Sequence, residues 1–207
     1  MPVSQAQLIP TKLALRRTVK AQRQGRSPAE REQASRALAA VGLELPRLRR
    51  SRCVALYASL PDEPGTALLR AGLRELGIRV LLPVVAADQD ARRLDWGEDQ
   101  DDVAPAGALH LPEPTGPRFW PAELGQAQVI LLPALAVDTT GTRLGRGGGY
   151  YDTALTQADP KALRLALVHD PEVLDAETTP IPREPHDVNV HGVITPTRWM
   201  FFGPVPE

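Results

Sequence analysis

The sequence contains a single cysteine, Cys53, among its 207 residues. One thiol excludes an internal disulfide, which is the usage expected in a reducing compartment. A lone cysteine can also serve as a nucleophile. Cys53 opens the apolar run CVALYASL, however, and we therefore interpret it as a buried core thiol.

Net charge is also nearly absent, since 24 Lys and Arg residues face 25 Asp and Glu residues and leave a formal charge of −1. That balance argues against a general nucleic-acid binder. No apolar stretch approaches the ~20 residues that a membrane span requires. The sequence thus predicts a cytoplasmic protein without nucleic-acid or membrane partners, and we expect a monomer.

Acidic residues are missing from the N-terminal region, where the first carboxylate is Glu30 and six cations precede it. Organellar transit peptides have this composition. A basic helix that belongs to the fold has it too, and no secretory hydrophobic region is present. Residues 11–24 have helical spacing of Leu13, Leu15 and Val19. We prefer the helix, for a reason given below.

Predicted strands and helices alternate along the rest of the chain. Ser27, Pro28 and Glu30 form a capping box with proline at the first helical position. We expect a second helix from there and further helices over 66–76 and 150–158. Strands are expected over 53–60, 78–86, 127–138, 163–170 and 188–195. We interpret 87–102 as an exposed acidic loop or hairpin, 110–117 as a proline-rich crossing and 197–207 as a short tail.

Several of these strands are apolar on both faces, and 127–138 is the most apolar and should be central. The pattern predicts an α/β fold: a single-domain layered sandwich over residues 1–207, with a mainly parallel central sheet flanked by helices.

The segment RLGRGGGYYD, residues 143–152, holds four glycines, two arginines and two tyrosines. It follows the central strand and precedes a predicted helix, so its bare amides and cations suit phosphate. It is not a Walker A loop, because no Gly-Lys pair occurs, and Tyr150 stands where the dinucleotide fingerprint needs its third glycine. The alternative is a flexible surface loop, which would not need two tyrosines directly after three glycines.

The stretch LLPALAVDTTGTRLGRGGGYYD resembles the signature of the 5-formyltetrahydrofolate cyclo-ligase family, also called 5,10-methenyltetrahydrofolate synthetases. Other segments are similar to the family as well: KLALR at 12–16, YASLPDEPGT at 57–66, LPEP at 111–114 and PIPREPHD at 180–187. Because Lys12 and Arg16 belong to this pattern, the resemblance assigns the basic N-terminal helix to the fold.

The resemblance implies ATP- and Mg²⁺-dependent cyclisation of 5-formyltetrahydrofolate to 5,10-methenyltetrahydrofolate, with release of ADP and phosphate. It also implies that Arg146 stabilises the transferring phosphoryl group and that Asp152 and Asp187 hold Mg²⁺. Folate would contact Tyr57, Glu63 and Tyr150. The ATP-binding residues would be Lys12, Arg16, Arg143, Leu144, Gly145, Arg146, Gly147, Gly148, Gly149, Tyr150 and Tyr151.

Each role has a plainer alternative. Lys12 and Arg16 can be a solvated helix face, Asp152 a helix cap, Asp187 a turn residue, Glu63 a surface residue and Tyr57 ordinary core. Some family members carry Lys where Gly148 stands, so that phosphate contact is either missing or supplied by Arg146. His169 and His186 have no paired-ligand spacing, and we assign them no metal.

Two other functions remain open on the residues alone. The first is a small-molecule kinase with a phosphate loop that is not of the Walker type. The second is a non-catalytic module that binds a nucleotide or a folate.

Overall fold

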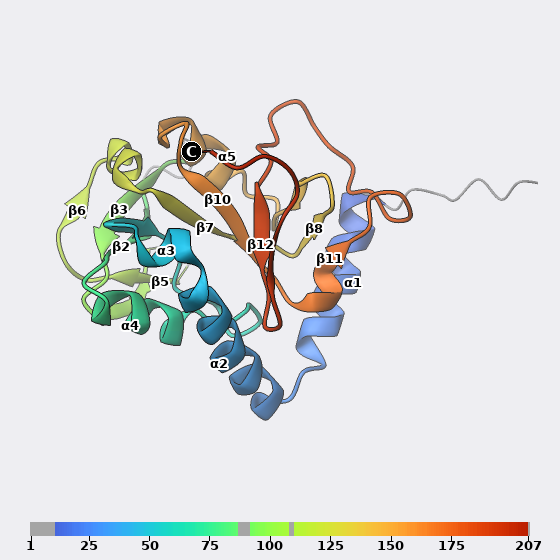
Figure 1. The fold of residues 1–207 in the computed structure, drawn as a ribbon, viewed down its shortest axis with the longest axis horizontal. Helices are drawn as coiled ribbons and strands as arrows, with labels where there is room; N and C mark the ends of the chain where they lie inside the picture. Colours follow the sequence, from blue (N-terminus) through green and yellow to red (C-terminus); the bar gives the residue numbers. More distant parts are fainter. Residues whose placement is uncertain (1–10, 87–91, 108–109, 207) are drawn as a thin grey trace, which may run out of the picture.

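The computed structural model describes residues 11–86, 92–107 and 110–206. Its centre is an eight-stranded sheet in the order β13-β12-β10-β7-β1-β2-β3-β6 (Figure 1). The strands, in chain order, are β1 Cys53–Ala55, β2 Arg79–Val85, β3 Leu94–Glu98, β6 Arg118–Phe119, β7 Val129–Pro133, β10 Leu163–Leu167, β12 Gly192–Ile194 and β13 Trp199–Phe201.

The five inner strands from β12 to β2 are parallel, and the outer strands on both sides are antiparallel. This confirms the predicted α/β architecture with a mainly parallel central sheet flanked by helices. Parallel strands buried on both faces explain why the inner runs are mostly apolar. The register pairs Val54 with Val80 on one side and with Val129 on the other.

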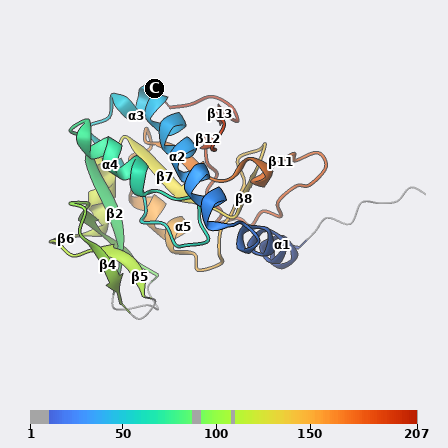
Figure 2. The ribbon, with the colours of Figure 1, turned by 90° about the horizontal axis from the view of Figure 1, so that it is seen from below.

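One face of the sheet is covered by three helices, which pack Leu38, Leu48 and Leu69 against the strands (Figure 2). These helices are α2 Pro28–Glu44, α3 Pro46–Arg49 and α4 Ala67–Glu75. The predicted capping box is present, because Ser27 Oγ accepts from the Glu30 amide and Glu30 Oε2 accepts from the Ser27 amide. The opposite face is covered by the short helices η1 Pro121–Gln126, α5 Tyr150–Ala154 and η2 Leu155–Gln157.

A smaller three-stranded sheet lies beside the first and supports helix α1, Lys12–Gln24. Its strands are β8 Ala136–Asp138, β9 Arg143–Leu144 and β11 Val173–Leu174, and β11 follows the short helix η3 Asp170–Glu172. Leu15 and Val19 of α1 pack on Ala136 and Leu144. The basic N-terminal segment is therefore a packed helix from Lys12 onward, as preferred above.

Buried Arg23 fixes the far end of α1. Its guanidinium donates from Nε and Nη2 to the two carboxylate oxygens of Glu172, each at 2.7 Å, and from Nη2 also to the Ala134 carbonyl at 2.7 Å. Both side chains are buried. Among the described residues, no helix is both long enough and apolar enough to cross a membrane.

Several predicted elements need correction. The run 127–138 is two strands in two sheets, because the chain leaves the main sheet after Pro133 and enters the small one at Ala136. The predicted tail contributes β13 to the sheet edge. The predicted crossing at 110–117 contains β5 Leu111–Pro114, which forms a hairpin with β4 Val103–Ala106.

The exposed loop expected over 87–102 is also wrong for its described part. Leu94–Glu98 is β3, an antiparallel neighbour of β2, and Trp96 is fully buried. The hairpin alternative fits this pairing. Residues 87–91 of this stretch lie outside the described residues. Cys53 is buried as expected, and burial raises the pKa of its thiol to about 11.

Candidate active site

A cavity of about 450 Å³ opens beyond the carboxyl ends of β1, β2 and β7. Ligands bind at this edge of parallel sheets in general. All fifteen residues predicted from the sequence line it. They are Lys12, Arg16, Tyr57, Glu63, Arg143, Leu144, Gly145, Arg146, Gly147, Gly148, Gly149, Tyr150, Tyr151, Asp152 and Asp187.

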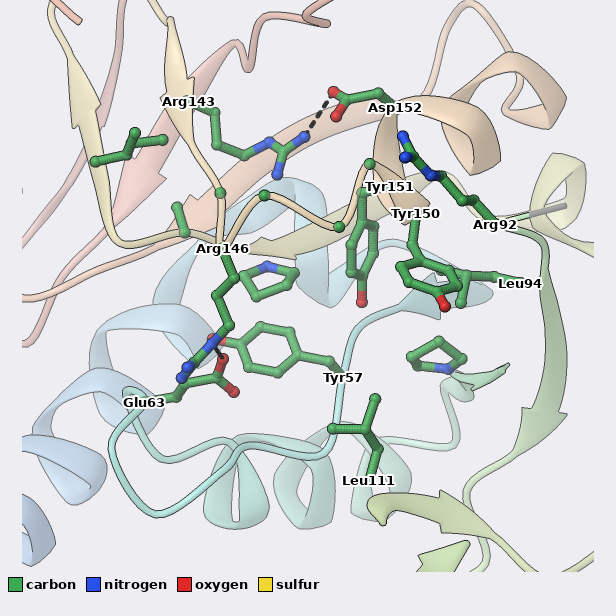
Figure 3. Close-up of a pocket in the computed structure, with 18 of the residues that line it drawn as sticks. Tyr57, Glu63, Arg92, Leu94, Leu111, Arg143, Arg146, Tyr150, Tyr151 and Asp152 are labelled. Atoms are coloured by element: carbon green, nitrogen blue, oxygen red, sulfur yellow. Dashed lines mark hydrogen bonds and ion pairs between the residues drawn. The ribbon is translucent and has the colours of Figure 1, made fainter. Parts of the chain in front are cut away.

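The glycine loop runs from β9 to α5 across one wall of the cavity (Figure 3). Gly147 has φ +103° and Gly149, which caps α5, has φ +73°. Side chains other than glycine rarely adopt these angles. A Cβ on Gly147 would also lie 3.5 Å from Arg16 Cζ. The backbone angles of the turn therefore require glycine at 147 and 149, whereas the contact with Arg16 is an ordinary van der Waals one.

Helix α1 forms the neighbouring wall. Arg16 Nε donates to the Gly145 carbonyl at 2.9 Å and so attaches the helix to the loop. Lys12 Nζ donates to Asp187 Oδ2 at 2.7 Å and to Glu184 Oε2 at 2.9 Å. Burial alone would lower the pKa of Lys12, but these two carboxylates outweigh it and raise the pKa. Neither Lys12 nor Arg16 is merely a solvated helix face.

Asp187 is correspondingly anionic. Burial would raise the pKa of its carboxyl, but hydrogen bonds from Lys12 and from the Glu184 amide lower it. Asp187 thus combines the turn contact considered above with a place in the cavity wall.

Asp152 Oδ1 accepts from Arg143 Nη2 at 2.8 Å and from the Val188 amide at 3.5 Å. The second contact brings Asp152 next to the residue that follows Asp187, although thirty-five positions separate the two carboxylates in sequence. The helix-cap alternative is not supported, because Gly149 caps α5 and no side chain makes a cap bond there.

Arg146 and Glu63 form an ion pair with each other. Arg146 Nε donates to Glu63 Oε1 at 2.9 Å, and Arg146 Nη2 donates to Asp62 Oδ1 at 2.7 Å. Glu63 Oε2 accepts from the Leu60 amide at 3.0 Å. The sequence assigned these two residues to different ligands, and Figure 3 shows them in contact across the cavity. Glu63 is largely buried, so it is not a surface residue.

Tyr57 and Tyr151 place buried hydroxyls near Glu63. Neither hydroxyl has a hydrogen-bond partner among the described residues. Burial, with a smaller contribution from the Glu63 charge, raises the pKa of both phenols well above the usual value. Both side chains therefore stay neutral. Tyr57 belongs to the core and lines the cavity at once.

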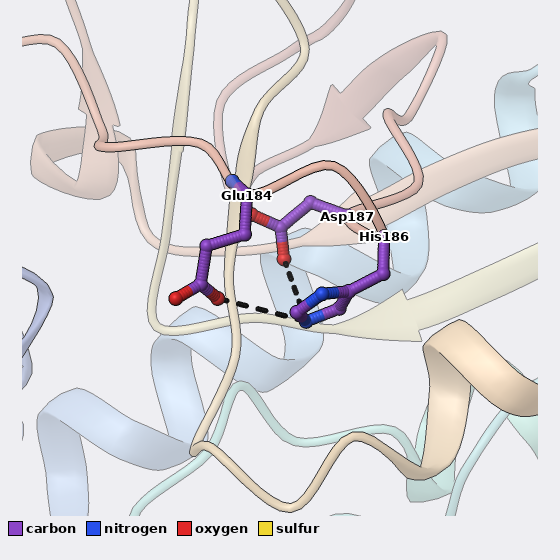
Figure 4. Close-up of side chains that lie close together, drawn as sticks. All are labelled: Glu184, His186 and Asp187. Carbon is purple, nitrogen blue, oxygen red and sulfur yellow. Dashed lines mark hydrogen bonds and ion pairs between the residues drawn. The ribbon is translucent and has the colours of Figure 1, made fainter.

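Sequence reasoning missed four ionisable side chains of the cavity: Arg92, Glu113, Glu184 and His186. Arg92 and Glu113 lie in segments interpreted as a loop and a crossing. Glu184, His186 and Asp187 gather within 4.8 Å of one another (Figure 4). Lys12 already pairs with two of these three side chains, Glu184 and Asp187. The third, His186, is exposed. His169 lies outside the cavity, as a buried residue of η3's cap.

The chain is similar to known proteins over most of its length. A sequence model of the family described as "5-formyltetrahydrofolate cyclo-ligase family" matches residues 9–196. A 5-formyltetrahydrofolate cyclo-ligase of Mycolicibacterium smegmatis is 46% identical over 150 residues, covering 71% of this chain and 75% of that protein. An enzyme of the same name from Escherichia coli is 25% identical over 181 residues, covering 87% and 97%.

A solved structure agrees with these matches. The NMR structure of Aquifex aeolicus 5,10-methenyltetrahydrofolate synthetase superimposes with a TM-score of 0.76 at 26% identity. The superposition covers 95% of this chain and 96% of that one.

Proposed function

Because the chain belongs to the 5-formyltetrahydrofolate cyclo-ligase family, we propose that its cavity carries out the Mg-ATP-dependent conversion of 5-formyltetrahydrofolate to 5,10-methenyltetrahydrofolate. One observation carries this proposal. The fifteen residues that the family resemblance associates with this chemistry come from segments scattered between Lys12 and Asp187, and they line a single cavity.

The reaction needs an activated formyl oxygen. The formyl oxygen attacks the γ-phosphorus of ATP and ADP leaves, so that a poor leaving group becomes a phosphate ester. N10 of the folate then attacks the activated carbon, the five-membered ring closes, phosphate departs with the oxygen, and N10 loses its proton. Both nucleophiles belong to the substrate. The described lining residues accordingly include no Ser, Thr or Cys.

The protein's task is therefore positioning and charge neutralisation, as in phosphoryl transfer generally. Lys12 and Arg16 would meet ATP phosphates from α1, and residues 143–151 would meet them from the loop. Arg146 would neutralise charge on the phosphoryl group in flight. Tyr57, Glu63 and Tyr150 would hold the folate, whose ring N–H groups suit a carboxylate.

The carboxylates fit Mg²⁺. Within the described residues, hydrogen bonds engage only Oδ1 of Asp152 and Oδ2 of Asp187, so each keeps one oxygen for a cation. Mg²⁺ prefers one or two carboxylates together with phosphate oxygens. When bound there, it would neutralise phosphate charge. In this structure Lys12 and Arg143 orient the two carboxylates.

An absorbance assay tests the proposal. Purified protein is mixed with 5-formyltetrahydrofolate and Mg-ATP, and the methenyl chromophore is followed. We expect its appearance together with one ADP and one free phosphate per product. A phosphorylated stable product would instead indicate a small-molecule kinase, and tight binding of both ligands without turnover would indicate a binding module.

A further inference from the structure

Asp62 is a charged residue next to the cavity that the chemistry above does not use. It does not line the cavity, yet its Oδ1 accepts from Arg146 Nη2 at 2.7 Å. Arg146 is thus held from two sides, because its Nε donates to Glu63 Oε1 at 2.9 Å. The guanidinium is about one-third exposed, and Asp62 is about one-quarter exposed.

This arrangement does not suit phosphate. One guanidinium between two carboxylates is a group with a net charge of −1, which repels an approaching anion. Arg146 can neutralise a phosphoryl group only after at least one carboxylate has released it. Gly145 and Gly147 flank Arg146, and Gly147 lies at φ +103°, so the backbone on both sides tolerates reorientation.

Glu63 is the carboxylate that folate would engage. Its Oε2 already accepts from the Leu60 amide at 3.0 Å, so N–H donors of a bound ring would compete with Arg146 for Oε1. A donor on Oε1 weakens the hold on Arg146 and leaves Asp62 as its only carboxylate partner among these residues. Arg146 with Asp62 alone is neutral, which removes the repulsion.

On the basis of the proposed function, we propose that Asp62 is a positioning residue for Arg146. Asp62, with Glu63, keeps the guanidinium away from the phosphates while the folate site is empty. Folate entry at Glu63 then frees Arg146 for the phosphoryl group. The consequence is positive coupling, in which folate tightens ATP binding and, by linkage, ATP tightens folate binding by the same factor.

The test is a binding experiment on the full chain. A non-hydrolysable β,γ-imido analogue of ATP is titrated with Mg²⁺ in the absence and presence of saturating 5-formyltetrahydrofolate. For the wild type we expect folate to tighten the analogue by about fivefold or more, at the lower end of ordinary coupling. Asp62→Asn should bind the analogue more tightly without folate, by roughly threefold to tenfold, and should lose most of the coupling.

Two further variants keep the test sharp. Asp62→Glu retains the charge and should keep the coupling. Asp101→Asn is the control, because it removes an exposed carboxylate that pairs with Arg74 at 3.1 Å and does not line the cavity. This variant should behave as the wild type. A merely structural role of Asp62 would lower stability without changing the coupling factor.

Three results would overturn the inference: no coupling in the wild type, wild-type coupling in Asp62→Asn, or weaker analogue binding by Asp62→Asn without folate. Failure of the proposed function looks different. In that case the wild type would not form the methenyl product, whereas an active wild type with unaltered Asp62→Asn coupling removes only the role of Asp62.

Discussion

The buried pair of Arg23 and Glu172 provides the most direct test of how α1 is attached. Glu172→Gln replaces the carboxylate that accepts two hydrogen bonds from the Arg23 guanidinium. The same carboxylate also accepts from the His169 amide. The side chains are 1% and 3% exposed, so water cannot replace the lost partner. The variant leaves an arginine charge uncompensated in the interior, and losing one partner of a buried ion pair costs about 3 kcal/mol or more.

For a chain of this size, one kcal/mol lowers the melting temperature by roughly 2–4 °C, so we expect a fall of roughly 6–12 °C. Calorimetry and urea unfolding measure it. The matched control is Glu32→Gln, which removes the exposed ion pair between Glu32 and Arg36 on α2. This variant should leave the melting temperature unchanged.

Activity gives a second measurement, which rests on the proposed function. Helix α1 carries Lys12 and Arg16 into the cavity, so a loosened helix should raise the KM for Mg-ATP more than it lowers kcat. Equal melting temperatures for Glu172→Gln and Glu32→Gln would refute the argument that this pair anchors the helix.

Three further predictions follow. Arg146→Ala should lower kcat by ~10²-fold with a smaller change in ATP binding; an unchanged kcat with a raised ATP KM would make Arg146 a ground-state binder. Asp152→Asn should raise the Mg²⁺ concentration needed for half-maximal activity, and Asp187→Asn likewise; Mg²⁺ titration at fixed ATP measures both, and unchanged values would remove the metal site. Burial lowers the pKa of His169 to about 4 from 6.5, so the unfolded chain binds the extra proton first as pH falls. The free energy of unfolding should therefore fall by about 3 kcal/mol in total between pH 6.5 and 4. In His169→Gln the urea midpoint should depend less on pH over the upper part of this range. An equal pH dependence in both proteins would contradict this origin.

The sequence predicted the inner sheet well because its signals are local. A continuous apolar run such as that of β7 can only be buried on both faces, and the capping box at Ser27 marks a helix start by its own hydrogen bonds. It predicted β3 poorly. Asp95 and Asp99 are typical of a surface loop in sequence, but both are buried beside arginines: Asp95 beside Arg93 of the same stretch, and Asp99 beside Arg70 of α4.

The site divides in the same way. The glycine loop was predicted by residue identity, since its turn angles demand glycine at 147 and 149. Contacts across the cavity have no local signal. Arg146 and Glu63 are 83 positions apart, and Lys12 and Asp187 are 175 apart. The family resemblance could therefore assign each residue to a ligand, but it could not show that residues assigned to different ligands bind each other.

Ion pairing among its own residues explains how the cavity accommodates so many charges. Asp187 pairs with Lys12, Asp152 with Arg143, and Glu63 with Arg146; the first and last pairs join distant segments, and the second joins the two ends of the glycine loop. An uncompensated charge at partly buried positions would cost several kcal/mol. On the proposed function, ligand binding at such a site would be an exchange of ion pairs, in which phosphate would take the cations while Mg²⁺ and folate donors would take the carboxylates. The charges proposed to bind the ligands are then the same charges that pair with one another across the cavity, so removing either member of a pair should alter both the pairing and the binding.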